Sequence, residues 1–348
     1  MSTFHHLSIK NIITETANAV SVVFDVPKNL QSNFSFTAGQ YITLKTTING
    51  NEIRRAYSIC SSPESGVLKV AIKAVENGIF SNYATSQLKI GDILEVHEPE
   101  GKFIIQPSKC LNYIGFAAGS GITPILSMIK SVLVQEPTAS FTLIYGNKTV
   151  EETIFKSELD ALKIAYSSRF NLHYVLSRET TEESFHGRID QSLTDYFINN
   201  RYKNWTFDTA YLCGPEQMIH TVSSTLQDCN FKESQILFEL FSVSVDEKVA
   251  SKIKNDESHV TVLLDDEEFS FTMKQTDNLL SASLRNDIDA PYSCQGGVCS
   301  SCLAKVTLGN AIMAKNTILS DQEVNDGFIL TCQAHPTTPE ISIDFDDI

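Results

Sequence analysis

The sequence predicts a multidomain protein in which an antiparallel β-barrel domain precedes a doubly wound α/β domain, and a small α+β domain ends the chain. Three observations support this fold class. The chain has 348 residues, which suits two or three domains of ordinary size. Its hydrophobic pattern changes near residue 109, and a polar stretch follows near residue 244. The expected divisions are a barrel domain at 1–108, an α/β domain at 109–243, a linker at 244–258 and a last domain at 259–348.

The first segment has the pattern of an antiparallel barrel. Short β-branched runs are bounded by Gly, Asn, Asp or Pro, and their close spacing is typical of barrels and sandwiches. The pattern predicts strands at 19–26, 40–47, 68–75 and 92–98, and a helix near 82–88.

The second segment alternates short apolar runs with helical stretches, which is the signature of a parallel, doubly wound sheet. The expected strands lie at 113–118, 140–146, 171–177, 209–213 and 236–241. The expected helices lie near 124–134, 151–165, 191–198 and 216–227.

The 244–258 stretch carries seven charged residues and no aromatic, so it is expected to be an interdomain linker. After it, runs at 259–264 and 268–273 predict a hairpin over Asp265-Asp266-Glu267. A short helix near 279–286, a cysteine loop and further short strands complete a segment of the size of one small α+β domain.

Composition limits the partners. The formal charge of −15 and a pI near 4.9 argue against nucleic acid and anionic membranes. The longest uncharged stretch, 111–129, is interrupted by glycines and a proline, so it predicts a strand, a loop and a helix start instead of a membrane span. The first residues lack the basic and apolar regions of a secretion signal. Eight cysteines in such a chain indicate reduced thiols in the cytoplasm. Most of Cys60, Cys110, Cys213 and Cys229 are expected to be small buried residues.

Four cysteines near the C-terminus have the spacing of an iron–sulfur site. Three come from one loop, Cys294-x4-Cys299-x2-Cys302, and Cys332 is the fourth. This is the plant-type [2Fe–2S] spacing, and Gly-Gly after the first cysteine allows backbone amides to approach the sulfurs. The alternatives are four unrelated buried cysteines or a zinc site, which usually pairs two short Cys-x2–4-Cys hooks. The spacing favours the cluster.

A second motif, Gly119-Ser-Gly121-Ile-Thr123-Pro124, directly follows the apolar run at 113–118. Glycines at a strand end let a pyrophosphate approach the backbone. We expect Thr123 to cap the next helix and Pro124 to be its first residue, so that the helix N-terminus faces the phosphates. A plain strand–helix turn is the alternative, but the position in a βαβ run favours dinucleotide binding.

The third motif, Arg55-Ala-Tyr57-Ser58, lies in a predicted strand. A guanidinium can hold a diphosphate bidentately, and an aromatic face can cover a flavin ring. An exposed arginine and a core tyrosine are the alternative. Farther along, Gly78-Ile-Phe80-Ser81 opens a helix whose N-terminus could take the same diphosphate.

The fourth motif, Cys213-Gly214-Pro215, ends another apolar run. Ligands of open α/β sheets bind at the carboxyl ends of the strands. A small thiol there could touch a nicotinamide without crowding it. A buried cysteine before a helix-starting proline is the alternative.

Together these motifs resemble, in kind and in order, those of the ferredoxin–NADP reductase-like flavoproteins with a C-terminal ferredoxin domain. This family includes the reductase components of multicomponent oxygenases. The resemblance covers essentially the whole chain and implies a β-grasp-like fold for the last domain. Within the family, the Leu-Ser-Arg-Glu segment at 176–179 and the Phe-Glu-Leu-Phe segment at 238–241 most resemble the subgroup that serves phenylacetyl-CoA epoxidase.

The resemblance implies roles for the flavin-side residues. Tyr57 would stack on the isoalloxazine, Ser58 would hydrogen-bond near the flavin N5, and Arg55 and Ser81 would hold the diphosphate. FAD is expected over FMN, because Gly78-x-x-Ser81 and the later Pro-x-Gly-x-Phe segment at 99–103 resemble the FAD-binding members.

The resemblance also implies the nicotinamide side of the site. Thr123 and Cys213 would flank the nicotinamide, and Glu239 and Phe241 would close the site. The catalytic candidates are therefore Ser58, Thr123, Cys213 and Glu239. The cofactor-binding candidates are Arg55, Tyr57, Ser58, Gly78, Phe80, Ser81, Gly119, Gly121, Thr123, Pro124, Ser177, Arg178, Cys213, Gly214, Pro215 and Phe241, and the cluster ligands are Cys294, Cys299, Cys302 and Cys332.

Two residues bear on the choice of electron donor. Ser177 and Arg178 are expected to end the third strand of the α/β domain, where the 2′-phosphate of NADPH would lie. A hydroxyl and a guanidinium suit that group, and Arg188 could assist. This favours NADPH over NADH, with a solvated arginine as the alternative.

The function that the resemblance implies is NAD(P)H-dependent reduction. The flavin would split a hydride into single electrons, the cluster would carry them, and a separate oxygenase, first of all phenylacetyl-CoA epoxidase, would receive them. The same chemistry could serve another client, such as a steroid hydroxylase, a desaturase or a hybrid-cluster protein. A redox-sensing protein that binds the cofactors without turnover is the alternative from another class.

Overall fold

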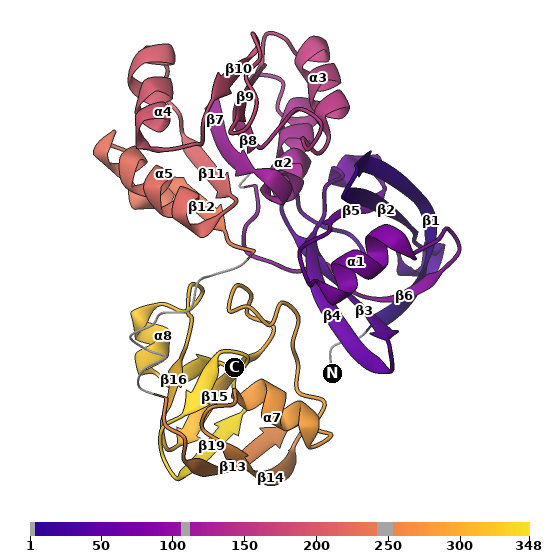
Figure 1. The fold of residues 1–348 in the computed structure, drawn as a ribbon, viewed down its shortest axis with the longest axis vertical. Coiled ribbons are helices and arrows are strands. Elements are labelled where there is room, and N and C mark those ends of the chain that lie inside the picture. The colour runs from indigo at the N-terminus through magenta and orange to yellow at the C-terminus, as the bar shows by residue number, and fades with distance from the viewer. Residues whose placement is uncertain (1–3, 106–111, 242–252) are drawn as a thin grey trace. The chain divides into compact units, whose positions relative to one another are not determined.

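The computed structural model describes residues 4–105, 112–241 and 253–348, and most of its strands belong to three main sheets (Figure 1). The chain forms two compact units. Residues Phe4–Leu240 hold the first two sheets, and the residues from Phe241 onward hold the third. Cys110 and most of the expected linker, residues 244–252, lie outside the described residues. The exact domain limits stay a prediction.

The first sheet is a six-stranded antiparallel barrel with the strand order β4-β3-β6-β1-β2-β5. An isolated bridge between Ile59 and Val70 links the two end strands of this order and closes it. Apolar side chains on the inner faces of the strands form the barrel core. The strands are β1 (Phe4–Thr16), β2 (Ala19–Asp25), β3 (Tyr41–Ile48), β4 (Asn51–Ser58), β5 (Leu68–Lys73) and β6 (Ile93–His97), and the helix α1 is Ile79–Ser86.

The expected start of the first helix near residue 82 was wrong, because α1 begins three residues earlier, at Ile79. Gly78 caps its N-terminus. A Cβ at Gly78 would lie 2.3 Å from Ser81 Oγ and 2.5 Å from Val75 Cγ2. The missing side chain therefore lets the chain turn sharply out of the barrel and enter the helix early.

The second sheet is parallel and doubly wound, with the order β10-β9-β8-β7-β11-β12. The chain moves outward from β7 to β10 and then returns to place β11 on the other side of β7, so the switch point lies between β7 and β11. Helices α2 and α3 lie on one side of this sheet and α4 and α5 on the other (Figure 1). The strands are β7 (Asn112–Ala118), β8 (Ser140–Asn147), β9 (Phe170–Leu176), β10 (Ser184–His186), β11 (Thr209–Cys213) and β12 (Ile236–Glu239). The helices are α2 (Ile122–Gln135), α3 (Lys156–Ala165), α4 (Gln191–Asp195) and α5 (Glu216–Asp228), and a π-helical segment, Tyr196–Arg201, continues α4.

The third sheet has the order β14-β13-β19-β15-β17. Its central pair, β13 and β19, is parallel, and the other pairs are antiparallel. The hairpin between β13 and β14 turns through Asp265 and Asp266, both with φ near +60°, as a two-residue type I′ turn requires. The elements are β13 (Glu257–Leu264), β14 (Glu267–Lys274), α7 (Leu279–Arg285), β15 (Leu303–Leu308), β16 (Ala311–Met313), α8 (Asp321–Asn325), β17 (Phe328–Leu330), β18 (Ala334–Pro336) and β19 (Glu340–Asp344).

Two further sequence expectations can be compared with these elements. In the part of the chain that the structure describes, no helix has the length and apolar character needed to cross a membrane. The helix expected at 151–165 begins only at Lys156, because Phe155 has a left-handed backbone with φ of 61°.

Candidate functional site

The two glycine motifs of the nucleotide domain meet at the switch point of the sheet. Cys213 ends β11 opposite Ala117 of β7. A Cβ on Gly121 would lie 2.1 Å from the carbonyl oxygen of Cys213. Gly214 is also closely surrounded, because its Cβ would lie 2.7 Å from Met218 Cε and 3.1 Å from the Cβ of Ala118. Without side chains at these two glycines, the turn after β7 can lie against the end of β11, at the switch point where ligands of doubly wound sheets bind.

Thr123 does not cap helix α2, so that expectation was wrong. A short 3-10 turn, Gly119–Gly121, runs straight into the helix, which begins at Ile122 with Gly121 as its cap. Thr123 is therefore already inside the first turn. Its buried hydroxyl donates to the carbonyl oxygen of Ser120 at 3.0 Å, and Pro124 is the third helical residue. The helix N-terminus still follows the glycine turn directly, as phosphate binding requires.

The flavin motif occupies the end of strand β4. Arg55 and Tyr57 are half-buried and Ser58, the last residue of the strand, is buried. The Arg55 guanidinium donates to the carbonyl oxygen of Arg54 at 2.6 Å. The Tyr57 ring lies 5.6 Å from the ring of Phe80 at a tilted angle. The strand therefore places the cation and the aromatic face of the motif at neighbouring positions.

The first turn of α1 lies against strand β4 through the contact between the rings of Tyr57 and Phe80. The Phe80 side chain is 1% exposed and belongs to the barrel core, so a contact with a cofactor there would use its main chain. The Ser81 hydroxyl accepts from the Val75 N–H at 3.3 Å. Ser81 thus holds the turn that Gly78 permits, in addition to its predicted part in binding a diphosphate.

Three of the four predicted catalytic side chains converge on one point. The Ser58 hydroxyl donates to Glu239 Oε2 at 3.1 Å, although the two residues come from different sheets. Glu239 ends β12 and pairs in register with Cys213. Burial, and then the neighbouring Glu239 carboxylate, raise the pKa of the Cys213 thiol well above its ordinary value. Cys213 is therefore a small neutral thiol in this site, not a nucleophile.

The remaining nicotinamide-side candidates lie at two other places. Pro215 caps helix α5 directly after Gly214. Phe241 is 40% exposed and is the last residue described before the gap at 242–252. Its part in closing the site stays a prediction.

Ser177 and Arg178 follow strand β9, which ends at Leu176. The main chain of both residues bonds to the end of β8, because Ser177 N–H donates to Asn147 and Arg178 N–H donates to Lys148. The Arg178 side chain is exposed, and no ion pair with it is found among the described residues. Arg188, after β10, is also exposed. Both guanidinium groups are thus free to meet an incoming anion.

Lys73, the last residue of barrel strand β5, is a candidate site residue that the sequence motifs did not reveal. Its Nζ lies 3.9 Å from the position of a Cβ on Gly119. Burial, set against the neighbouring Glu152 carboxylate, lowers the pKa of this lysine, and no ion pair with it occurs in the described ranges. A half-buried cation beside the glycine turn suits a phosphate group. A lysine ending a strand was the only signal, and nothing in the sequence connected it to Gly119.

The four predicted cluster ligands form one group. Cys294 is half-buried, and Cys299, Cys302 and Cys332 are buried. The sulfurs of Cys294 and Cys299 are 3.1 Å apart. Cys332 interacts with the thiols of both Cys294 and Cys302, which links all four side chains. A plant-type cluster needs four such convergent sulfurs.

Backbone amides surround these sulfurs. The Gly296 N–H donates to Cys294 Sγ at 3.3 Å, and Gly297, whose φ is +72°, directs its amide at Cys332. Amide donors of this kind stabilise the negative charge on cluster sulfurs. The loop therefore fits a [2Fe–2S] cluster in both its ligands and its donors.

The thiols of Cys299 and Cys332 have raised pKa values. The contact with Cys294, together with burial, raises the pKa of Cys299. The contact with Cys294 lowers the pKa of Cys332, but the contact with Cys302 and burial together outweigh it and raise this pKa to about 12. Binding of the metal must therefore displace protons from the loop.

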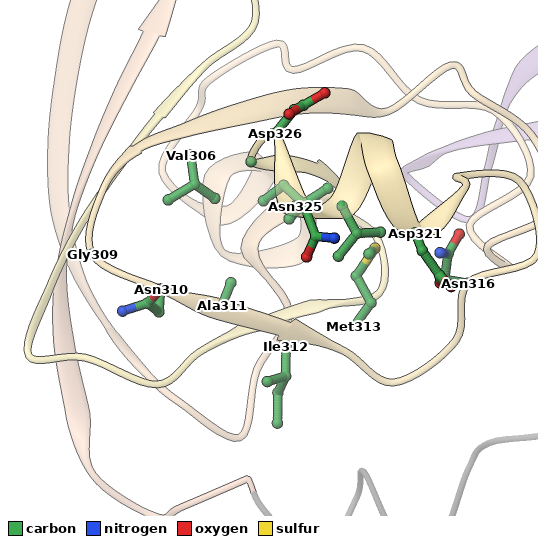
Figure 2. Close-up of a pocket in the computed structure, with 13 residues that line it drawn as sticks. Val306, Gly309, Asn310, Ala311, Ile312, Met313, Asn316, Asp321, Asn325 and Asp326 are labelled. Atoms are coloured by element: carbon green, nitrogen blue, oxygen red, sulfur yellow. The ribbon is translucent and has the colours of Figure 1, made fainter.

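Two further observations do not bear on the assignment of the cofactor sites. Within the described ranges, no group of three or more His, Cys, Asp or Glu side chains has the arrangement for a single metal ion. A hollow of about 640 Å³ lies in the unit of the third sheet. Figure 2 shows that strands β15 and β16 and helix α8 enclose it, with Asn310 and Asn316 at opposite ends. It contains none of the predicted site residues.

Comparison with known proteins agrees with this geometry. Three family models match the chain in order: an oxidoreductase FAD-binding domain over residues 6–105, an oxidoreductase NAD-binding domain over 116–224 and a 2Fe-2S iron-sulfur cluster binding domain over 262–337. The expected fold class and cofactor set are confirmed.

Two curated relatives and one solved structure are similar over nearly the full length. The chain is 39% identical to a component of the 1,2-phenylacetyl-CoA epoxidase of Escherichia coli (strain K12), covering 99% of both chains. It is 32% identical to the ferredoxin reductase component of 3-ketosteroid-9-alpha-monooxygenase of Rhodococcus rhodochrous, covering 97% of this chain and 96% of the relative. The structure of phthalate dioxygenase reductase matches with a TM-score of 0.68 and 23% identity, covering 98% of both chains, which shows a shared fold.

Proposed function

Because the chain belongs to the ferredoxin–NADP reductase-like flavoproteins with a C-terminal [2Fe–2S] domain, we propose that it is the reductase component of an oxygenase that epoxidises phenylacetyl-CoA. The family makes it an oxidoreductase that uses FAD, a nicotinamide dinucleotide and a [2Fe–2S] cluster. The observation that carries the choice of client is the 39% identity, over 99% of both chains, to the component of phenylacetyl-CoA epoxidase.

The cofactors supply the redox chemistry: the flavin exchanges a hydride for single electrons, and the cluster carries one electron at a time. The protein must then bind the cofactors, orient them and keep water out. The end of strand β12, beside Cys213 of β11, meets the end of the flavin strand at the contact between Ser58 and Glu239. This meeting point is where we place hydride transfer.

We assign the flavin-side roles from the motif positions. Arg55 and Ser81 bind the FAD diphosphate, with Gly78 and the main chain of Phe80 at the same turn. Tyr57 packs on the flavin ring, and the Ser58 hydroxyl orients its reactive edge. The half-buried Tyr57 and the fixed Ser81 turn support these roles.

We assign the nicotinamide-side roles in the same way. Gly119, Gly121 and the start of helix α2, including Thr123 and Pro124, bind the pyrophosphate. Cys213, Gly214 and Pro215 border the nicotinamide, and Glu239 and Phe241 close over it. Ser177 and Arg178 hold the 2′-phosphate, so NADPH is the proposed donor. The close approach of Gly121 to Cys213 supports a single continuous nucleotide site.

A reconstituted assay tests the proposed client. The purified protein, loaded with FAD and iron, is combined with the other components of the Escherichia coli epoxidase, phenylacetyl-CoA and NADPH. We expect oxidation of NADPH that requires the substrate and is matched by epoxide formation. Reduction of ferricyanide without any transfer to this oxygenase would contradict the client and leave the reductase chemistry intact.

A second client is favoured by one observation, the 32% identity to the steroid monooxygenase component. The same assay with the oxygenase component of 3-ketosteroid-9-alpha-monooxygenase decides between the two. A protein that only senses redox state would bind the cofactors but fail to reduce ferricyanide or cytochrome c with NADPH. We place the protein in the cytoplasm, because cysteines spaced for a cluster suit a compartment in which thiols stay reduced.

A further inference from the structure

Gln333 directly follows the cluster ligand Cys332 and is only 9% exposed. Its main chain is fixed on both sides. The Gln333 N–H donates to the carbonyl oxygen of Leu330 at 2.8 Å, and its own carbonyl oxygen accepts from the Ala314 N–H at 2.8 Å. A side chain on such a fixed backbone has few positions open to it.

The side-chain amide of Gln333 lies across the cysteine loop. Its Nε2 donates to the carbonyl oxygen of Gln295 at 3.1 Å. The same nitrogen lies 3.7 Å from Cys332 Sγ, within the range of a hydrogen bond to sulfur. A Cβ on Gly297 would lie 2.9 Å from Gln333 Cγ, so the glycine makes room for this side chain. The amide therefore joins the segment after Cys294 to the sulfur of the last ligand.

A neutral N–H donor beside a cluster sulfur has a definite electrostatic effect. Reduction adds negative charge to the cluster, and a donor pointing at a sulfur stabilises the more negative state. The effect is large in a buried site, because little water is present to screen the dipole. Such a donor raises the reduction potential without touching the irons.

We propose that Gln333 is a positioning residue that raises the reduction potential of the cluster, by donating to the Cys332 sulfur while holding the cysteine loop through Gln295. The proposal rests on the proposed function, because it requires the [2Fe–2S] cluster. It makes Gln333 part of the driving force for electron transfer from flavin to cluster.

The test compares two buried glutamines of the same unit. Gln333→Met keeps the length of the side chain and removes both N–H donors. Gln275→Met is the matched control, because Gln275 is 3% exposed and its Nε2 donates to Ser258 Oγ at 3.1 Å instead of to a cysteine. The midpoint potential of each iron-loaded full-length protein is measured by redox titration followed by electron paramagnetic resonance.

We expect Gln333→Met to raise the ratio of oxidised to reduced cluster at a fixed potential by about threefold to tenfold. A tenfold change corresponds to about 59 mV for a one-electron couple. Gln275→Met should leave the midpoint in place. An unchanged midpoint in Gln333→Met, with the full iron content of the wild type, would overturn the proposal.

Should Gln333→Met fail to hold iron, Gln333→Leu takes its place, since it also lacks the amide donors and adds no charge. A midpoint that falls relative to wild type supports the proposal, and one that stays or rises contradicts it. Absence of iron from the wild-type protein itself would refute the cluster assignment, which is a different result.

Discussion

Ser58, Cys213 and Glu239 form the proposed site of hydride transfer, which needs no acid–base pair. They end three strands, β4, β11 and β12. Ser58 donates to Glu239, and Glu239 raises the pKa of the Cys213 thiol, in addition to the larger effect of burial. Each side chain is small or already paired. We propose that these residues act by setting distance and orientation, which alone can account for large rate factors.

Replacement of Cys213 tests this positioning role. Cys213→Ala should retain FAD and the cluster but slow hydride transfer by about 10- to 100-fold, because the nicotinamide loses a fixed contact at the reacting end. Stopped-flow bleaching of the flavin with unlabelled and deuterated NADPH measures the step directly. Cys60→Ala is the matched control, since Cys60 is also fully buried but bonds to the carbonyl oxygen of Lys69 in the barrel. Equal rates in the two variants would contradict a positioning role for Cys213.

The choice of donor is a second property of single residues. Arg178→Ala should lower kcat/KM for NADPH by about 10- to 100-fold, because a guanidinium–phosphate pair is lost. The value for NADH should change little. Arg201→Ala, at the end of the π-helical segment, removes the same charge from another exposed position. A wild-type preference for NADH, or equal losses with both donors, would show that Arg178 does not read the 2′-phosphate.

At the scale of elements, hydrophobic periodicity predicted most of the architecture. The expected strand at 209–213 matches the structure. The hydrophobic pattern did not predict strand β1, because irregularities at 9–11 and 14–16 break the alternation of its apolar and polar residues. Strand β10 has only three residues, too few for a period. The Thr123 cap was wrong because a tight glycine turn merges with the helix and shifts its start.

The candidate site was predicted from local motifs and not from hydrophobic periodicity. The motifs indicated the strand ends that we assign to the site, because glycine and cysteine spacing is local in the sequence. They could not predict pairs such as Ser58 with Glu239 or Lys73 with Gly119, which only the packing of two sheets creates. Tertiary contacts between distant segments leave no periodic signal in one sequence.

Helix α2 connects the two sheets of the first unit. It begins at the pyrophosphate turn, and its residue Ser127 donates to the carbonyl oxygen of Ser61 at 2.6 Å, three residues after the flavin motif. Lys130 donates to the carbonyl oxygen of Cys60 at 3.2 Å and pairs with Glu158 of α3. Lys69 of the barrel pairs with the same Glu158. Burial opposes the ionised carboxylate, but the two ammonium groups prevail and hold the pKa of Glu158 below its ordinary value.

Removal of the Lys130 contacts with Cys60 and Glu158 should destabilise the first unit. We expect Lys130→Met to cost about 1–2 kcal/mol of unfolding free energy, between the values for exposed and buried ion pairs. Because the pKa of Glu158 is depressed, its share of stability is present at neutral pH and is lost as pH falls through the folded-state pKa. Urea unfolding of the FAD-loaded protein, followed by flavin fluorescence, measures the change.

Lys156→Met is the matched control for Lys130. Lys156 pairs with Asp160 at 2.6 Å on the same helix as Glu158, so its ion pair stays within one element. Exposed pairs of this kind contribute about 0.3–0.5 kcal/mol. If the two variants lose the same stability, the contact between α2, α3 and the barrel does not fix the two sheets together.

At the scale of the whole molecule, the electron path crosses from one compact unit to the other. The flavin and nicotinamide motifs lie in Phe4–Leu240, and all four cluster ligands lie in the second unit. Cys302→Ser should therefore abolish the cluster and transfer to the oxygenase, but leave reduction of the flavin by NADPH and of ferricyanide close to the wild-type rate. Iron analysis and single-turnover flavin bleaching test this separation. Loss of flavin reduction in Cys302→Ser would show that the two units do not act in series.

The second unit also carries an acidic end. Asp346 accepts hydrogen bonds at 2.9 Å from the amides of Asp265 and Asp266, which ties the β13–β14 turn to the C-terminal segment. Strand register places this turn at the same end of the sheet as the cluster. Leu303 and Leu330, which flank the ligands Cys302 and Cys332, pair with each other beside that end. We expect the oxygenase to dock on this acidic end through a small, charged contact. Charge in such a contact governs the rate at which the two proteins meet more than their affinity.

Electron delivery to the oxygenase should therefore depend on salt. We expect the delivery rate to fall by about tenfold or more as ionic strength rises well past ~0.1 M, where the Debye length is about 10 Å. Flavin reduction at saturating NADPH should change far less, because it needs no docking of a second protein. The double replacement Glu267→Gln and Glu268→Gln, at exposed positions next to the turn, should weaken the salt dependence. Glu182→Gln with Glu183→Gln removes the same charge from an exposed loop of the nucleotide domain and is the control. Equal effects of the two double replacements would mean that total charge, not an acidic face beside the cluster, governs the encounter.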